Sequence, residues 1–263
     1  MILDQIVEKT RIRIQKEKTE ISPKEMRNKA KELSSDTGYP FLKALSKKGM
    51  SYICEVKKAS PSKGIISEDF NYIEIAKEYE KIGASAISVL TEPDYFQGNI
   101  LFLKDIKEKV NLPLLRKDFI IDPYMIDQAK VNGADAILLI CALLTEEELS
   151  TYQAYAESLG LSALVEAHNE EEVAKALRAR AKIIGINNRD LRDFSVDIHN
   201  SLRYRHLIPE DVIFVSESGI TERDQIIELE ANHVNAVLIG ETMMKAKDKQ
   251  GMMDTLRGYT HED

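Results

Sequence analysis

The chain has 263 residues, of which 30% are charged and 43% are hydrophobic, a composition typical of a folded globular protein. Its net charge of −8 argues against a general nucleic-acid-binding surface, so local groups have to hold any anionic ligand. The two cysteines form no C-x-x-C pair, so neither a zinc site nor a redox dithiol is expected.

The N-terminal segment and the short apolar runs favour a cytoplasmic protein. Its first twenty residues, MILDQIVEKTRIRIQKEKTE, are charged throughout and lack the apolar region of a signal peptide. Apolar runs elsewhere are too short for a membrane span. We therefore expect no membrane or nucleic-acid partner. We also expect a monomer, with a homodimer as the alternative.

The first 48 residues read as helices at 2–16, 23–34 and 41–47, with a turn-rich break, SSDTGYP, at 34–40. No flexible linker or low-complexity tract follows them. We expect one domain over residues 1–263, with an N-terminal helical extension at 1–48 and a barrel at 49–263. The N-terminal helices are expected to border the mouth of this barrel.

Eight apolar runs then alternate with helical patterns, at the spacing of βα units. One predicted helix, 122–133, begins with Asp-Pro and ends at Gly133; another, 145–160, opens with a Thr-x-x-Glu capping box. The order predicts an α/β fold, a (β/α)₈ TIM barrel. A doubly wound open sheet is the alternative, but no G-x-G-x-x-G turn is present. The predicted strands are 52–56, 86–90, 112–116, 136–140, 162–166, 182–187, 212–216 and 236–240.

Several predicted strands are apolar at their start and polar at their carboxyl end, on one face. Since side chains alternate along a strand and the carboxyl ends of barrel strands form the active-site face, these polar groups should meet at one mouth. Buried charges are costly unless they are paired or used, so a catalytic site is expected there. The residues are Glu55, Lys57, Lys117, Glu166, Asn187 and Glu217.

A phosphate site is predicted after the last two strands. The stretches SESGIT (216–221) and LIGETM (238–243) each lead from a strand into a helix, with Thr221 as the expected cap of the first helix. Backbone N–H groups at such turns bind anions. Gly219 and Gly240 would allow a phosphate to approach the backbone closely, and the loop after the first strand would add Ser60 and Ser62 or their backbone amides.

Motifs spread over nearly the whole chain resemble those of the indole-3-glycerol phosphate synthases. They include EVKKASPSKG (55–64), LLRKDFIIDPYMI (114–126), LVEAH (164–168), IGINNRDL (184–191) and LIGETMM (238–244). The resemblance implies ring closure, decarboxylation and dehydration of 1-(2-carboxyphenylamino)-1-deoxyribulose 5-phosphate to indole-3-glycerol phosphate, in tryptophan biosynthesis. It implies no metal and no organic cofactor.

The resemblance also implies roles for the residues at the mouth. Lys117 corresponds to the general acid, Lys57 to its partner lysine and Glu166 to the base or proton relay; the division of steps between the two lysines stays open. A lysine near carboxylates is expected to keep its charge and act as an acid, whereas burial and the second lysine are expected to lower the pKa of Lys117. Glu55 and Asn187 would position lysine and substrate, Glu217 would contact the substrate, Arg189 and Phe119 would shape the anthranilate pocket, and Ser60, Ser218, Gly219 and Gly240 would hold the phosphate.

Other interpretations remain at this stage. A Schiff-base aldolase would use Lys57 or Lys117 as its nucleophile. The sister isomerase of the tryptophan pathway uses a Cys/Asp pair, whereas Cys54 has the outward parity of its strand. A phosphate-binding barrel without catalysis would not need the converging lysines and glutamates. His168 lies just beyond the fifth strand without ligand spacing; no special role is favoured for it, with a place in the lining of the mouth as the alternative.

Overall fold

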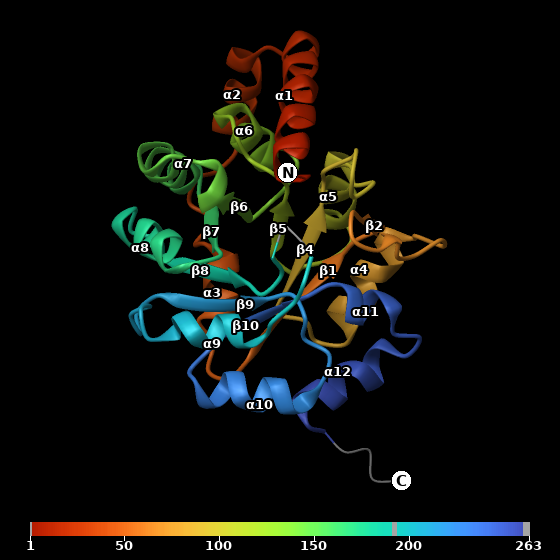
Figure 1. The fold of residues 1–263 in the computed structure, drawn as a ribbon. Coiled ribbons are helices and arrows are strands. Elements are labelled where there is room, and N and C mark those ends of the chain that lie inside the picture. The colour runs from red at the N-terminus through yellow and green to blue at the C-terminus, as the bar shows by residue number, and fades with distance from the viewer. Residues whose placement is uncertain (1, 191–193, 260–263) are drawn as a thin grey trace.

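Eight parallel strands form a closed barrel in the computed structural model, which describes residues 2–190 and 194–259. The strands follow one another around the barrel in chain order, with β1 closing between β4 and β10 (Figure 1). The prediction of a (β/α)₈ barrel is confirmed and the open sheet is excluded. The strands are β1 (Ser51–Val56), β4 (Ala86–Leu90), β5 (Leu114–Lys117), β6 (Ala136–Ile140), β7 (Ser162–Ala167), β8 (Ile183–Asn187), β9 (Ile213–Glu217) and β10 (Ala236–Ile239).

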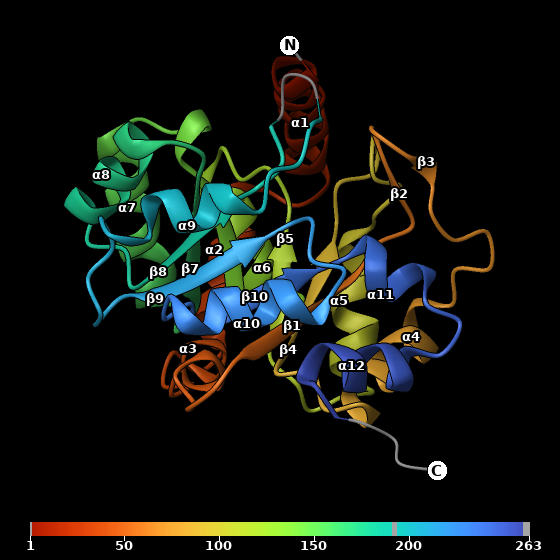
Figure 2. The same cartoon turned by 60° about the horizontal axis from the view of Figure 1, so that its bottom comes forward.

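Helices surround the barrel on its outer side (Figure 2). They are α4 (Tyr72–Lys81), α5 (Ile100–Lys107), α6 (Pro123–Val131), α7 (Glu146–Ser158), α8 (Glu170–Arg178), α9 (His199–Arg205), α10 (Arg223–Ala231), α11 (Glu241–Lys245) and α12 (Lys249–Arg257). A 3₁₀ turn, η1 (Cys141–Leu143), and a small hairpin, β2 (Ala59–Ser60) with β3 (Gly64–Ile65), were not predicted. Across the two described ranges, no helix is long and apolar enough to cross a membrane.

The predicted caps hold at two helices and fail at a third. Asp122 caps α6, and Thr145 and Glu148 form the capping box of α7. The expectation for Thr221 is wrong, because α10 starts at Arg223 with Glu222 as its N-cap. The side chain of Gln225 reaches back to the Glu222 and Thr221 backbone N–H groups, which moves the start of the helix past Thr221.

Side chains of the barrel strands separate into two apolar layers. Ile53, Leu115, Leu164 and Val215 pack inside the barrel with the other inward-facing residues. Cys54 lies in the layer between the sheet and the helices, in agreement with its outward parity. The inner layer fills the lower barrel, so the polar groups are left at the carboxyl ends of the strands.

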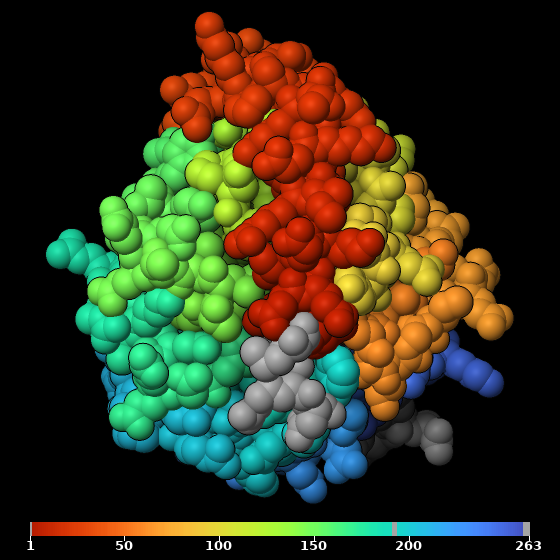
Figure 3. All heavy atoms as spheres, turned by 45° about the horizontal axis from the view of Figure 1, so that its top comes forward, coloured from red at the N-terminus to blue at the C-terminus, as the bar shows by residue number. Residues whose placement is uncertain are grey.

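The three N-terminal helices occupy different places. Helix α3 (Pro40–Leu45) buries Phe41 and Leu45 completely in the inner layer, which closes the amino end of the barrel. Helix α2 (Pro23–Glu32) packs on α6, and α1 (Ile2–Glu20) runs beside both and across the face of the molecule at the carboxyl ends of the strands, away from α3 (Figure 3). The expectation that these helices border the mouth therefore holds for α1 and is wrong for α3. The domain division at residues 48 and 49 stays a prediction.

A buried ion cluster ties α1 to the end of β5. Asp118 accepts hydrogen bonds from Arg13 of α1 at 2.9 Å, from Arg116 at 3.0 Å and from Thr91 at 2.6 Å. Burial acts to raise the pKa of Asp118, but Arg13 and Arg116 outweigh it and lower this pKa to about 2. Because Asp118 follows Lys117 directly, the cluster fixes the backbone beside a candidate catalytic residue.

We predict that Phe41→Ala destabilises the protein by about 3–5 kcal/mol, because it leaves a cavity at the closed end of the barrel. Urea unfolding followed by circular dichroism measures this change. The control is Leu33→Ala, since Leu33 is 45% exposed and should cost little. Equal stability of the two variants would show that Phe41 does not plug the barrel.

We predict that Asp118 contributes about 2 kcal/mol of stability that is lost as pH falls from about 4 to 2. The pKa of its carboxyl group is lower in the folded than in the unfolded protein, so the unfolded chain binds more protons in this range. In Asp118→Asn, the free energy of unfolding should fall less steeply between about pH 4 and pH 2 than in the wild type. The substitution should also destabilise at neutral pH, since two buried guanidinium groups lose their partner. Asp36→Asn is the control, because Asp36 is exposed. If the free energy of unfolding of Asp118→Asn fell with pH as steeply as that of this control, Asp118 would not be the stabilising carboxylate.

Candidate active site

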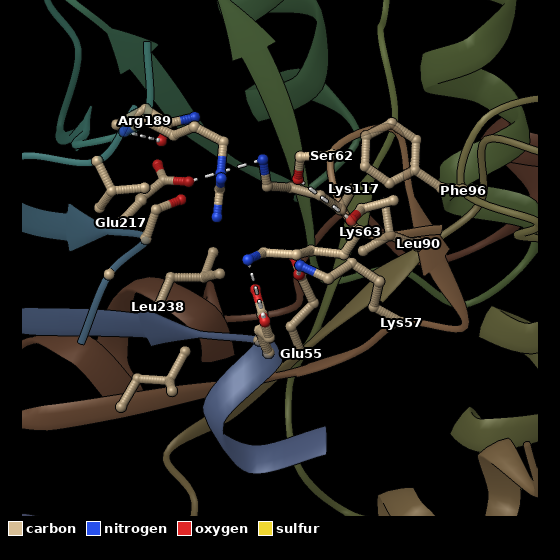
Figure 4. A pocket seen from close by; sticks show the side chains of 18 of the residues that line it. Glu55, Lys57, Ser62, Lys63, Leu90, Phe96, Lys117, Arg189, Glu217 and Leu238 are labelled. Atoms are coloured by element: carbon tan, nitrogen blue, oxygen red, sulfur yellow. Dashed lines mark hydrogen bonds and ion pairs between the residues drawn. The ribbon is translucent and has the colours of Figure 1, made fainter. Parts of the chain in front are cut away.

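All twelve candidate residues line one cavity of about 680 Å³ at the carboxyl ends of the strands. This volume falls in the range of small-molecule sites. The cavity is polar and charged at its centre, and Figure 4 shows side chains of different strands pointing into it. The twelve residues are Glu55, Lys57, Ser60, Lys117, Phe119, Glu166, Asn187, Arg189, Glu217, Ser218, Gly219 and Gly240. Their catalytic and binding roles stay predictions.

Lys117 lies between two carboxyl groups in the middle of the cavity. Its Nζ donates to Glu166 Oε2 at 3.1 Å and lies 3.6 Å from Glu217 Oε2. Asn187 donates to the other oxygen, Glu166 Oε1, at 3.3 Å. The three strands β5, β7 and β9 thus supply an ammonium group held between two potential proton carriers.

The pKa of Lys117 is raised, and the expectation of a lowered pKa is wrong for the site without substrate. Burial does act to lower it, but the carboxylates of Glu166, Glu217 and Glu55 outweigh burial. Lys57 cannot supply the expected repulsion, because its Nζ is paired with Glu55 Oε1 at 2.5 Å. Lys117 therefore carries its proton before substrate binds.

The two carboxyl groups beside Lys117 have opposite pKa shifts. Burial acts to raise the pKa of Glu166, but Lys117 and His168 outweigh it and lower that pKa well below its usual range. Burial raises the pKa of Glu217, and the Glu166 charge adds to the effect. The single positive charge of Lys117 lies near both carboxyl groups and does not stabilise the ionised form of both against burial. Such a pair suits separate acid and base roles.

Two glycines, Gly185 and Gly240, lie directly beside the charged groups of the cavity, where a Cβ atom would contact them. A Cβ at Gly240 would lie 2.4 Å from Glu55 Oε1 and 2.7 Å from Lys57 Nζ. A Cβ at Gly185 would lie 2.1 Å from Glu217 Oε1. A side chain at position 240 would therefore displace the ends of the Glu55 and Lys57 side chains from their present positions. Gly185, an inward position of β8, is a site residue that sequence reasoning missed.

The predicted phosphate residues line the cavity at the end of the strands where the chain leaves β1, β9 and β10. Ser60 Oγ lies 3.5 Å from Ser62 Oγ in the loop after β1. Ser218 and Gly219 have positive φ angles of 71° and 84°, and Asn188 Nδ2 donates to the Ser218 carbonyl at 3.0 Å. Because α10 starts only at Arg223, this turn precedes the helix and does not form its first turn.

Glu241 lies at this end of the cavity, but cations hold its carboxylate. Its Oε1 is 2.6 Å from Lys245 Nζ and 4.0 Å from Lys63 Nζ. The pKa of Glu241 is lowered: burial opposes the shift, and the hydrogen bond and charge of Lys245 outweigh burial. The carboxylate is thus neutralised locally and does not exclude an anion from the neighbouring backbone.

Another part of the cavity wall is apolar and suited to an aromatic ring. The rings of Phe96 and Phe119 have centroids 6.0 Å apart. Leu3 and Ile6 of α1 also line the cavity, and sequence reasoning did not single them out. Arg189 reaches over the cavity in Figure 4, and its guanidinium donates to the Phe194 carbonyl at 3.1 Å. Leu191, the last residue of IGINNRDL, lies outside the described residues.

His168 was the other residue that sequence reasoning undervalued. Its Nε2 lies 3.3 Å from Glu166 Oε1. A signal was present, because residues 166 and 168 share the inward parity of β7 and its extension. Within the part of the chain that the structure describes, no three or more His, Cys, Asp and Glu residues are grouped to hold a metal ion.

Comparisons with known proteins agree with this geometry. The family model described as indole-3-glycerol phosphate synthase matches residues 3–256. The indole-3-glycerol phosphate synthase of Endomicrobium trichonymphae is 57% identical over 94% of this chain and 95% of its own length. The indole-3-glycerol phosphate synthase of Ruminiclostridium cellulolyticum is 51% identical over 98% of this chain and 99% of its own length.

Solved structures support the fold independently. A crystal structure of 3-hexulose-6-phosphate synthase superposes with a TM-score of 0.63, covering 80% of this chain and 99% of that chain at 15% identity. At this identity the similarity shows the barrel fold alone. Sequence matches over nearly the full length, together with the cavity, show more: the chain belongs to the indole-3-glycerol phosphate synthase family, the carboxy-lyases that make indole-3-glycerol phosphate in tryptophan biosynthesis.

Proposed function

We propose that Lys117 is the general acid of this synthase and that Glu166 is the base that follows it. The observation that carries this proposal is the position of Lys117 Nζ between Glu166 and Glu217 at the centre of the cavity. An acid and a base in direct contact can exchange the proton that one step releases and another consumes.

The two ends of the cavity would orient the substrate. The phosphate of 1-(2-carboxyphenylamino)-1-deoxyribulose 5-phosphate would bind at Ser60, Ser218, Gly219 and Gly240, and its aromatic ring between Phe119 and Arg189. With both ends held, the ring carbon faces the C2 carbonyl, and the closure becomes an intramolecular attack.

Ring closure would move negative charge onto the C2 oxygen, which Lys117 protonates. Such an oxyanion is a stronger base than a lysine amine, so the proton moves despite the raised pKa of Lys117. The substrate carboxylate, which Lys57 would contact, then leaves as carbon dioxide, and the bonding electron pair that it leaves behind restores the aromatic ring. Glu55 holds Lys57 in place through the 2.5 Å contact.

Dehydration would use Glu166 as the base. As the C2 hydroxyl leaves with a proton, as water, Glu166 accepts the proton that the new pyrrole ring gives up. Asn187 supports this role by donating to Glu166 Oε1, while Glu217 contacts the substrate from the opposite strand. Which lysine protonates the leaving hydroxyl is the open part of this scheme.

The raised pKa of Lys117 argues against the aldolase interpretation, since a Schiff base needs an unprotonated amine. Further parts of the proposal are that the enzyme acts without a metal or organic cofactor, in the cytoplasm, and as a monomer. The homodimer remains the alternative to the monomer.

We predict that the purified protein converts the carboxyphenylamino substrate in buffer with chelator and no added metal. Appearance of indole fluorescence measures the reaction. A signal that needs added divalent metal would contradict the cofactor-free proposal. A flat signal under all conditions, from folded protein and intact substrate, would contradict the assigned substrate.

We predict that Lys117→Ala lowers kcat by about 100-fold or more, the usual worth of a general acid. Single-turnover fluorescence measures the chemical step directly. Lys77→Ala is the matched control, because Lys77 pairs with Glu74 on the exposed face of α4. If the two variants were equally active, Lys117 would not be the acid.

A further inference from the structure

His168 lies between two carboxylates, one inside the active site and one outside it. Its Nε2 lies 3.3 Å from Glu166 Oε1, and its Nδ1 lies 3.0 Å from Glu172 Oε2. The side chain of His168 is 17% exposed, and that of Glu166 is 2% exposed. The three groups form a continuous chain from the centre of the cavity to the start of α8.

The first turn of α8 fixes the outer end of this chain. Asn169 caps the helix by accepting from the Glu172 backbone N–H at 2.9 Å. Glu172 Oε2 then accepts from the backbone N–H of His168 at 2.9 Å and faces the ring. The imidazole therefore has one orientation, with a proton on Nδ1 directed at Glu172.

This orientation decides the state of the other ring nitrogen. Nε2 forms no hydrogen bond with any described residue, but Glu166 Oε1 lies 3.3 Å from it. An unprotonated Nε2 would therefore place a lone pair close to a carboxylate, which is repulsive. A protonated Nε2 makes the ring an imidazolium between two anions. Burial acts to lower the pKa of His168, but the nearby carboxylates of Glu166 and Glu172 outweigh burial and raise it to about 10.

The other charged and titratable neighbours do not change this balance. On the active-site side, Lys117 and Glu217 face Glu166. Behind Glu172, Cys141 of η1 keeps its proton, because burial raises its pKa to about 12. His168 and Glu172 also line a second cavity, of about 620 Å³, where the charged neighbours are Arg189, Asp190, Asp197 and Arg203.

We propose that His168 is a positioning residue: held by Glu172, it keeps Glu166 ionised and fixes Oε1, so that Oε2 faces Lys117. Asn187 supplies a neutral donor to the same Oε1, and His168 supplies the positive charge. The inference deepens the proposed function, since it rests on Glu166 being the base. It also explains why the pKa of Glu166 is lowered although burial acts to raise it, whereas burial raises the pKa of Glu217.

The first test measures the protonation state of His168 by ¹⁵N NMR of its imidazole in the whole enzyme. We expect both ring nitrogens of the wild type to stay protonated beyond pH 8. The Glu172→Gln variant keeps an oxygen acceptor but removes the charge. The midpoint of the His168 imidazole titration should therefore fall by about one to three pH units in this variant. A wild-type midpoint near the ordinary value of about 6.5 would overturn the proposal.

The second test separates positioning from folding. His168→Gln should lower kcat about tenfold while KM changes less than about twofold, because binding groups stay in place and only the base is disturbed. His199→Gln is the matched control, since His199 forms a similar but exposed pair with Glu228, 3.6 Å apart. If kcat of His168→Gln equalled that of the control, the proposal would fail even if both variants folded.

Glu166→Gln distinguishes this inference from the proposed function on which it rests. A large loss of kcat in Glu166→Gln together with an unaffected His168→Gln overturns the role of His168 alone. Wild-type turnover in Glu166→Gln overturns the base assignment, and the inference with it. The wild-type imidazole titration needs no variant, so a failure of His168→Gln to fold would not remove the test.

Discussion

The register of eight parallel strands is the constraint on which the site depends. Because the strands close into one barrel, their carboxyl ends lie on one face, and hydrogen-bonded pairing sets which residues are neighbours. Asn187 pairs with Glu217 across β8 and β9, and Ile140 pairs with Glu166 across β6 and β7. A one-residue slip of any of these strands would turn its polar end residue out of the cavity.

The charges gathered there differ in protonation because their surroundings differ. Glu166 has Lys117, Asn187 and His168 around it, whereas Glu217 shares only Lys117 and has a buried oxygen without a hydrogen-bond partner among the described residues. Burial therefore dominates at Glu217 and is overcome at Glu166. The different surroundings of Glu166 and Glu217 are enough to shift their pKa values in opposite directions, although both are ordinary glutamates.

The N-terminal helices connect the fold to this chemistry from both ends of the barrel. Helix α3 fills the closed end, so the inner apolar layer supports the strands below the site. Helix α1 contributes Leu3 and Ile6 to the cavity, and Arg13 binds the carboxylate that follows Lys117. Movement of α1 would therefore change both the apolar wall and the backbone at the candidate acid.

The sequence by itself determined the barrel and the inward parity of the six polar strand-end residues, because strand alternation and βα spacing are local properties. Phe119, Arg189 and Ser218 were implied only by the resemblance to the synthase family. Tertiary structure alone decided the pKa of Lys117, where carboxylates from β1, β7 and β9 outweigh burial. It also decided the place of α3 and the contact of His168 with Glu166. These depend on distances between segments far apart in the chain, and on the balance of burial against charge that only those distances set.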